Sequence, residues 1–310
     1  MGTPLLWVGF NLFVLLAIAL DLGVFHRKPH KIEIREATFW SLAWIALGTA
    51  FGYFVWRFHG SQRGLEYFTG YLIEKALSVD NLFVFLVIFR TFQVPEQVQH
   101  RVLALGILGA LVMRGILIAA GVALIARFHW LLPAFGIFLL YTGLQMLWKR
   151  EKQVHFEKNA VFRFASSHLR VSKEYQGGKF FVRQAGQLVA TPLLLVLLVI
   201  EIADVTFATD SIPAIFGITR DPFIVYTSNV FAILGLRTLY FLLSDLLAYL
   251  RYLGVGLALV LLFIGIKMVL DPWWHISVSL SLAVVGGILF LATLVSLRAR
   301  PPDVPPGTDA

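Results

Sequence analysis

The 310-residue chain contains no cysteine. This absence excludes disulfide bonds, thiolate metal sites and cysteine nucleophiles within the chain. Charged residues are also scarce, because Asp, Glu, Lys and Arg together make up 14% of the chain, whereas soluble domains carry about 25%. Apolar residues make up 58%, and the mean hydropathy is +0.79. This composition excludes an ordinary soluble domain and favours an integral membrane protein.

The sequence also lacks the motifs of several enzyme classes. Its eight histidines show no HExxH motif, and there is no Walker motif. We therefore expect no catalytic activity, no permanent cofactor and no ATP hydrolysis by this chain. The net charge of +8 comes from basic residues in the loops between apolar runs. Topology-setting charge explains them better than nucleic-acid binding does.

Nine apolar runs are about long enough to cross a bilayer. They cover roughly 4–25, 38–57, 67–90, 102–126, 130–148, 190–217, 224–249, 253–270 and 276–297. We therefore expect an all-α polytopic membrane protein with about nine transmembrane helices. The first run has no basic segment before it and no clear A-x-A site before a polar segment, so we expect it to be retained and not cleaved as a signal peptide.

Basic residues in the loops predict the orientation. Eighteen Lys and Arg residues fall in loops on one side of a nine-span arrangement, nine of them in 149–189, and four fall on the other side. This bias predicts an outside N-terminus and a cytoplasmic C-terminus. The expected organisation is two helices with a basic cytoplasmic loop in 1–66, a three-helix repeat in 67–148, a basic cytoplasmic loop in 149–189, a second repeat in 190–270, a last helix in 271–297 and a disordered tail in 298–310.

Two of the apolar runs contain carboxylates, and the two runs resemble each other. The shared motif consists of Glu74, Asp80 and Asn81 in the first run and of Asp204, Asp210 and Ser211 in the second. A charge at membrane depth costs a few kcal/mol or more, so such residues are candidates for function by default. Their duplication predicts a path for a cation.

The duplication extends beyond the carboxylates. Further matches pair Arg114 with Arg237, Gly143 with Gly265, and Gln145 with Lys267. Each copy holds three spans, an odd number, so the second copy should cross the membrane in the opposite sense. We therefore expect two inverted three-helix repeats, which place substrate sites near the bilayer midplane.

Polar residues occupy more than one face of each acidic helix, so neither helix can face lipid and both should be central. Pro213 removes one helical hydrogen bond. It predicts either an interruption around 209–211, with carbonyl oxygens freed as ligands, or a kink without a ligand role.

The stretches EKALSVDNLFVF, FATDSIPAIFGIT and SNVFAILGLRTLYF resemble the TerC family of integral membrane proteins, which is named for tellurium resistance and includes Alx-type proteins. The resemblance covers about 10–297. It implies a metal-ion exporter with manganese as the favoured substrate, and kinship with lysine-exporter-like transporters built from inverted three-helix repeats.

The residues of the duplicated motif suit such a substrate. Carboxylate, amide and hydroxyl oxygens favour hard or borderline divalent ions, without selecting Mn²⁺ from Mg²⁺ or Ca²⁺. We expect anionic ligands from Glu74, Asp80, Asp204 and Asp210, and neutral oxygens from Asn81 and Ser211. Accessory roles are open to Asp21, Glu201, Arg114, Arg237, Lys75 and Lys267. The four basic residues could neutralise the carboxylates when no metal is bound, or form permanent ion pairs that make the acidic residues structural.

Export of a divalent cation from a negative interior needs a driving force, because each charge costs about 2.3 kcal/mol per 100 mV. Protons are the expected counter-ion, since close carboxylates in a low dielectric tend to hold protons until a metal displaces them. Two other functions stay open. One is export of a basic amino acid, and the other is a membrane-protein assembly factor that docks partners on 149–189.

Overall fold

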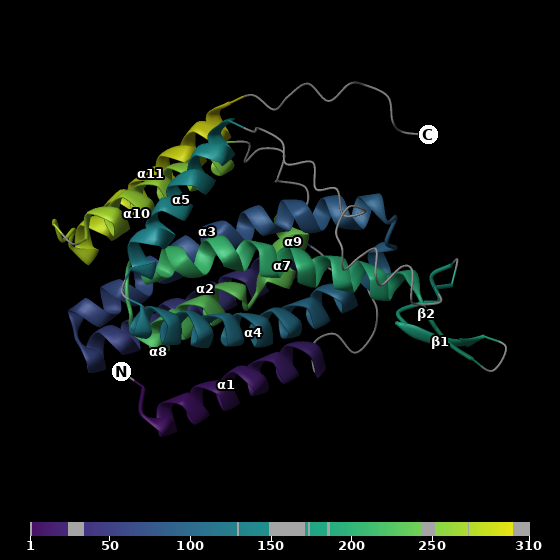
Figure 1. Cartoon of the computed structure of the whole chain (residues 1–310). Coiled ribbons are helices and arrows are strands. Elements are labelled where there is room, and N and C mark those ends of the chain that lie inside the picture. The colour runs from purple at the N-terminus through teal and green to yellow at the C-terminus, as the bar shows by residue number, and fades with distance from the viewer. Residues whose placement is uncertain are drawn as a thin grey trace.

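The structure is a computed structural model that describes residues 2–23, 34–128, 130–148, 171–172, 174–184, 187–243, 252–271 and 273–299. At residues 21–23, 34, 80, 83 and 243 the description covers the backbone only. The helices in these ranges are α1 (Pro4–Gly23), α2 (Ile34–His59), α3 (Ser61–Thr91), α4 (Glu96–Arg127), α5 (Leu131–Trp148), α7 (Pro192–Phe216), α8 (Pro222–Ile233), α9 (Leu236–Leu243), α10 (Leu253–Leu270) and α11 (Val278–Arg298). The predicted all-α polytopic membrane fold is confirmed (Figure 1).

Seven helical segments of the described residues are long and apolar enough to cross a membrane. α1 is apolar over Pro4–Leu20, which is shorter than the 18 residues that define a candidate span. α3 is not among the seven, yet its 31 residues extend about 46 Å at 1.5 Å per residue, which exceeds a bilayer core of about 30 Å. Its acidic and basic residues lower its hydropathy. A helix of this polarity needs protein neighbours on several sides.

α3, α7 and α8 form the centre of the bundle. Within the segment Pro222–Leu242, 94% of the apolar window is buried, against 22–56% in the other six candidate spans. α3 packs on α8 and on α7, and α7 packs on α4. In Figure 1, α5, α10 and α11 lie together along one side of this centre, and α1 lies on the opposite side. The helix with the predicted first acidic motif is therefore central.

Small residues allow α5 and α10 to pack closely. A Cβ atom on Gly136 would lie 2.9 Å from the carbonyl oxygen of Gly265, and one on Gly265 would lie 2.8 Å from the carbonyl oxygen of Gly136. About two helical turns further along α5, a Cβ atom on Gly143 would lie 2.9 Å from the carbonyl oxygen of Ala258. Close backbone approach at small residues is a common way to join helices in a membrane.

The structure differs in detail from the sequence-based expectations at two points, and at a third it decides between two alternatives. The run 224–249 is not one helix, because α8 ends at Ile233 and the backbone turns at Gly235 with φ of 80° before α9 begins. The domain boundary expected at 66–67 falls inside α3, which begins at Ser61 after Gly60 with φ of 93°. α7 continues through Pro213 to Phe216, so it is not interrupted at 209–211.

A β-hairpin precedes α7 in the part of 149–189 that the structure describes. Strands β1 (Phe181–Gln184) and β2 (Gln187–Ala190) pair in antiparallel register. The Tyr175 hydroxyl donates to the carbonyl oxygen of Phe92 at 2.7 Å, which ties this segment to the end of α3. The expected basic loop therefore contains a short folded element at its C-terminal end.

Candidate functional site

A buried arginine joins two of the predicted carboxylates. Arg114 of α4 lies between Glu74 of α3 and Asp204 of α7. Its Nε donates to Asp204 Oδ2 at 3.1 Å, its Nη2 donates to Asp204 Oδ1 at 2.9 Å, and its Nη1 donates to Glu74 Oε1. The three residues are 2%, 0% and 4% exposed, in the order arginine, glutamate, aspartate. Three helices thus meet at one ion-paired group, called here the Arg114 cluster.

Each charged group of the Arg114 cluster has a partner of opposite charge. A buried charge without a partner is costly, and the planar guanidinium matches a carboxylate with two parallel hydrogen bonds. Two carboxylates and one guanidinium leave the cluster with a formal charge of −1. Lysine could not reproduce this arrangement, since an ammonium offers no such fork. The cluster can therefore accept a cation or a proton in exchange for a contact with Arg114.

The other predicted carboxylates lie along the same two helices. Asp210 is half-buried in α7, and Thr142 Oγ1 of α5 donates to its Oδ1 at 3.5 Å. Asp80 lies in α3, but its side chain is outside the described residues, as is that of Asp21 in α1. Asn81 is buried in α3. The structure therefore brings Glu74 and Asp204 together and leaves the relation of Asp80 to them undescribed.

The accessory residues have separate surroundings. Lys75 Nζ donates to the carbonyl oxygen of Ala232 at 3.1 Å, and Lys267 Nζ donates to Ser281 Oγ at 3.1 Å. Glu201 lies against α4 where Gly109 leaves room, since a Cβ atom there would overlap the carboxylate. Arg237 is buried in α9.

Several buried polar atoms of α3, α7 and α8 form no hydrogen bond with the described residues. They are Glu74 Oε2, Ser78 Oγ, Ser211 Oγ, and both Oδ1 and Nδ2 of Asn229. Most buried polar groups in folded proteins are hydrogen-bonded, so each exception calls for an explanation. Sequence reasoning did not single out Asn229 of α8. The only signal for it was a lone amide within the apolar stretch SNVFAIL.

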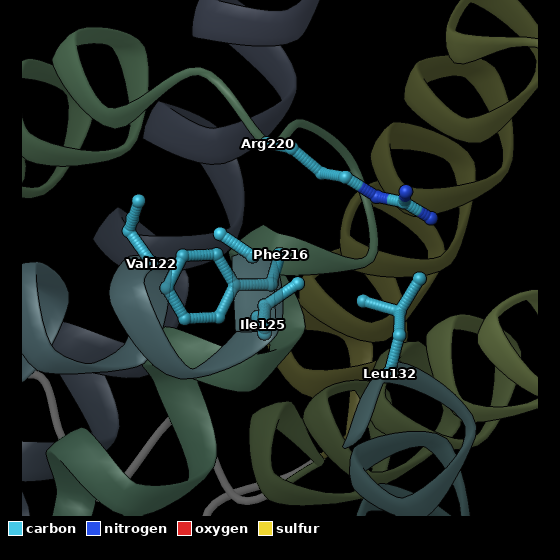
Figure 2. A pocket seen from close by; sticks show the side chains of 6 residues that line it. Val122, Ile125, Leu132, Phe216 and Arg220 are labelled. Atoms are coloured by element: carbon cyan, nitrogen blue, oxygen red, sulfur yellow. The ribbon is translucent and has the colours of Figure 1, made fainter. Parts of the chain in front are cut away.

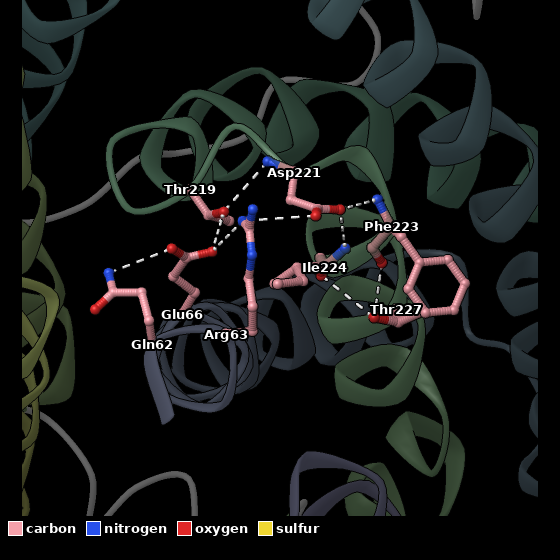
Figure 3. A network of polar contacts seen from close by, with 8 residues as sticks. All are labelled: Gln62, Arg63, Glu66, Thr219, Asp221, Phe223, Ile224 and Thr227. Carbon is pink, nitrogen blue, oxygen red and sulfur yellow. Dashed lines mark hydrogen bonds and ion pairs between the residues drawn. The ribbon is translucent and has the colours of Figure 1, made fainter. Parts of the chain in front are cut away.

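A polar cavity of about 500 Å³ opens where α3, α8 and α11 begin and α10 ends. On its floor, Arg63 lies 3.0 Å from Glu66 and 3.5 Å from Asp221, and the Thr219 hydroxyl donates to Glu66 at 2.6 Å (Figure 3). A smaller, mainly apolar pocket of about 200 Å³ adjoins it, with Arg220 at its edge (Figure 2). Neither lining includes a residue of the Arg114 cluster.

The described residues contain no group of three or more His, Asp or Glu side chains that could hold a metal ion. Glu74 and Asp204 are engaged by Arg114, and the side chain of Asp80 falls outside that description. The four-carboxylate metal site therefore stays a prediction. The oxygen donors that are present, carboxylate, amide and hydroxyl, fit a hard cation as a passing substrate.

Comparison with known proteins gives strong matches over nearly the whole chain. Residues 59–303 match the family described as "Integral membrane protein TerC family". The chain is 48% identical over 303 residues to the "Uncharacterized membrane protein STKORF319" of Myxococcus xanthus, covering 97% of this chain and 95% of that protein.

It is 45% identical over 304 residues to the "Putative membrane-bound redox modulator Alx" of Escherichia coli (strain K12), covering 95% of each chain. It is 38% identical over 291 residues to an "Uncharacterized membrane protein" of Rickettsia bellii, covering 94% of this chain and 96% of that one. No solved structure gives a significant match.

Proposed function

This chain belongs to the integral membrane protein TerC family, and on that premise we propose that it is a secondary transporter that exports a divalent cation, most favourably Mn²⁺. The observation that carries the proposal is the Arg114 cluster. A multi-pass membrane protein that places an arginine between two buried carboxylates from different helices bears a desolvation cost that an apolar core would avoid.

Arg114 would serve as an internal counter-ion. In the structure its guanidinium satisfies Glu74 Oε1 and both oxygens of Asp204, so the helices hold together without a transported ion. A divalent cation that reaches the cluster would compete with the guanidinium for these oxygens. Release of one carboxylate by Arg114 would then change how α4 packs against α3 and α7. This exchange couples ion binding to helix movement, which alternating access requires.

The packing of α5 on α10 supports inverted repeats as the basis for alternating access. Gly143 corresponds to Gly265 in the repeat alignment, and the same offset places Gly136 on Ala258. Exchanging the two copies therefore turns the Gly136–Gly265 contact into the Ala258–Gly143 contact, and the structure contains both. Likewise α3 packs on α8, and α7 packs on α4, which are equivalent pairs. A two-fold axis in the membrane plane has these properties.

Proton exchange is the proposed driving force, with the carboxylates of the cluster and Asp210 as proton carriers. The proposed location is the plasma or inner membrane, with the N-terminus outside and the C-terminus in the cytoplasm. The name of the Escherichia coli relative points to redox. This chain has no cysteine for thiol–disulfide exchange, so we attribute any redox effect of it to metal supply.

The test is ⁵⁴Mn²⁺ transport in everted vesicles or proteoliposomes containing the full chain. The unmodified protein should move Mn²⁺, and an Asp80→Asn/Asp210→Asn variant and a Glu74→Gln variant should not. Thr206→Val is a matched control, because Thr206 is an exposed residue of α7 whose hydroxyl donates to the Ile202 carbonyl within the helix. It should transport normally.

Three outcomes would redirect the proposal. Mn²⁺ transport that ignores an imposed pH gradient would remove proton coupling. Saturation by lysine in place of metal would favour a basic amino-acid exporter. No transport by the folded, unmodified protein would favour the assembly-factor function, in which loss of the 149–189 charges should matter more than loss of the carboxylates.

A further inference from the structure

Asn229 is a buried amide for which the fold supplies no partner among the described residues. It lies in α8, is 0% exposed, and neither Oδ1 nor Nδ2 forms a hydrogen bond there. A buried amide that loses water and gains no partner lowers stability, whereas a leucine of similar shape would not. A residue of this kind in the most buried segment of the bundle therefore points to a ligand.

Three central helices meet next to Asn229. A Cβ atom on Gly70 of α3 would lie 3.0 Å from Ser228 Oγ of α8 and 3.6 Å from Ile215 Cγ2 of α7. One helical turn from this crossing, in opposite directions along the chain, lie Glu74 on α3 and Ser211 on α7. Glu74, Ser211 and Asn229, which carry unpartnered polar atoms, therefore occupy helix positions within about one turn, roughly 5 Å of helix rise, of the same crossing.

The direction of Asn229 follows from its neighbours on α8. Ser228 points to α3, where it contacts the Gly70 position. Tyr226 points to α4 and α1, because its ring lies 3.6 Å from the Gly115 position and its hydroxyl donates to Asn11 Oδ1 at 2.8 Å. At about 100° per residue, Asn229 lies about 100° from Ser228 and about 60° from Tyr226, on the arc between them. That arc runs from the side of α8 that faces α3 to the side that faces α4 and α1, and Arg114 of α4 contacts Glu74 of α3.

We propose that Asn229 supplies an amide oxygen ligand to the transported cation, and that it does so together with the free carboxylate oxygen of Glu74 and the hydroxyl oxygen of Ser211. This inference rests on the transport function proposed above and adds a third helix, α8, to the two acidic ones. Asn229 is thus a substrate-binding residue outside the duplicated acidic motif.

This set of donors specifies the class of substrate. It contains one carboxylate oxygen and otherwise neutral oxygens, and no nitrogen or sulfur donor. Such a site suits a hard or borderline cation, such as Mg²⁺, Ca²⁺ or Mn²⁺, and disfavours Cu⁺ and Zn²⁺, which prefer thiolate and imidazole. The single carboxylate oxygen keeps binding weak enough for release.

The experiment measures thermal unfolding of the full chain in detergent with increasing MnCl₂. A ligand that binds only the folded state raises the melting temperature, and the concentration dependence gives the affinity. Asn229→Leu removes both polar atoms and keeps the shape. Thr227→Val is the matched control, because Thr227 is equally buried in α8, is about 200° from Asn229 on the helix, and donates to the Phe223 carbonyl at 2.7 Å.

We expect Asn229→Leu to weaken Mn²⁺ binding roughly tenfold or more, the loss expected for one contact to a charged group. Its melting temperature without Mn²⁺ should equal or exceed that of the unmodified protein. Thr227→Val should keep the original Mn²⁺ affinity. Asn229→Asp, which keeps an oxygen at this position, should bind Mn²⁺ at least as tightly as the unmodified protein.

Unchanged affinity in Asn229→Leu, or a loss as large in Thr227→Val, would overturn the role of Asn229 and leave the transport function standing. So would a lower melting temperature of Asn229→Leu without Mn²⁺ together with failure of Asn229→Asp to bind Mn²⁺, because both indicate a structural role. Absence of any Mn²⁺ effect on the unmodified protein, with no ⁵⁴Mn²⁺ transport, would overturn the transport function and this inference together.

Discussion

Arg114 and Asp204, which are 90 positions apart in the chain, face each other with two hydrogen bonds of 3.1 and 2.9 Å. The pair joins α4 to α7 in the interior of the bundle, and Glu74 of α3 accepts a further hydrogen bond from Arg114. The cluster can hold the three helices in one arrangement only as long as its charges remain balanced. That dependence on charge leads to the first prediction.

Replacing Arg114 with Gln should lower the free energy of unfolding by about 3–5 kcal/mol, because it leaves two buried carboxylates unpaired. The measurement is reversible unfolding in mixed micelles. The control is the triple variant Glu74→Gln/Arg114→Gln/Asp204→Asn, which removes all three charges and should be less destabilised than the single variant. Equal losses would mean that the shape of these side chains, and not their charge, holds the helices.

Gly136→Ala should destabilise the contact of α5 with α10 by about 1–3 kcal/mol, because overpacking a close helix contact forces the backbones apart. The new Cβ atom would lie 2.9 Å from a backbone oxygen that cannot move alone. Gly287→Ala in α11 is the control, since no atom lies within 4 Å of that position. It should be neutral or stabilising by up to about 1 kcal/mol, the gain in helix propensity. Similar losses in both variants would contradict the close packing.

Asp221 caps α8 and also lies near Arg63, and two substitutions separate these roles. Its Oδ1 accepts from the backbone N–H of Phe223 at 3.0 Å and of Ile224 at 3.4 Å. Asp221→Ala removes the cap and should cost about 1 kcal/mol of stability, whereas Asp221→Asn keeps an equally good cap. Thermal unfolding should show the smaller loss for Asn. If both variants lose the same amount, the ion pair with Arg63 outweighs the cap.

Gly235 allows the break between α8 and α9. Its φ of 80° disfavours any residue with a Cβ atom, and a Cβ atom there would lie 2.7 Å from the Trp44 side chain. Gly235→Ala should therefore cost more stability than Gly60→Ala, which has φ of 93° but no atom within 4 Å. The left-handed backbone alone costs about 1–2 kcal/mol. The difference between the two variants, measured by unfolding, reports the overlap with Trp44. Equal losses of stability in the two variants would show that α2 moves enough to accommodate the added methyl group.

Much of the architecture could be predicted from the sequence because a membrane imposes simple rules. Apolar runs of about twenty residues must be helical, since lipid satisfies no backbone hydrogen bond. If the carboxylates of α3 and α7 faced lipid, their desolvation would cost too much free energy. The two helices were therefore expected to be central, as they are. The break at Gly235 was less visible, because glycine within an apolar run does not by itself end a helix.

Local patterns along the chain were enough to predict the class of protein, the helices and the two acidic motifs, because hydropathy and charge act locally. Which charges meet could be seen only in the folded bundle. Arg114, Glu74 and Asp204 come from three helices, and their pairing depends on how those helices cross. The surroundings of Asn229 depend on the crossing where Gly70 lets α3, α7 and α8 approach. Helix crossings arise from packing between distant segments, which hydropathy along a single segment does not encode.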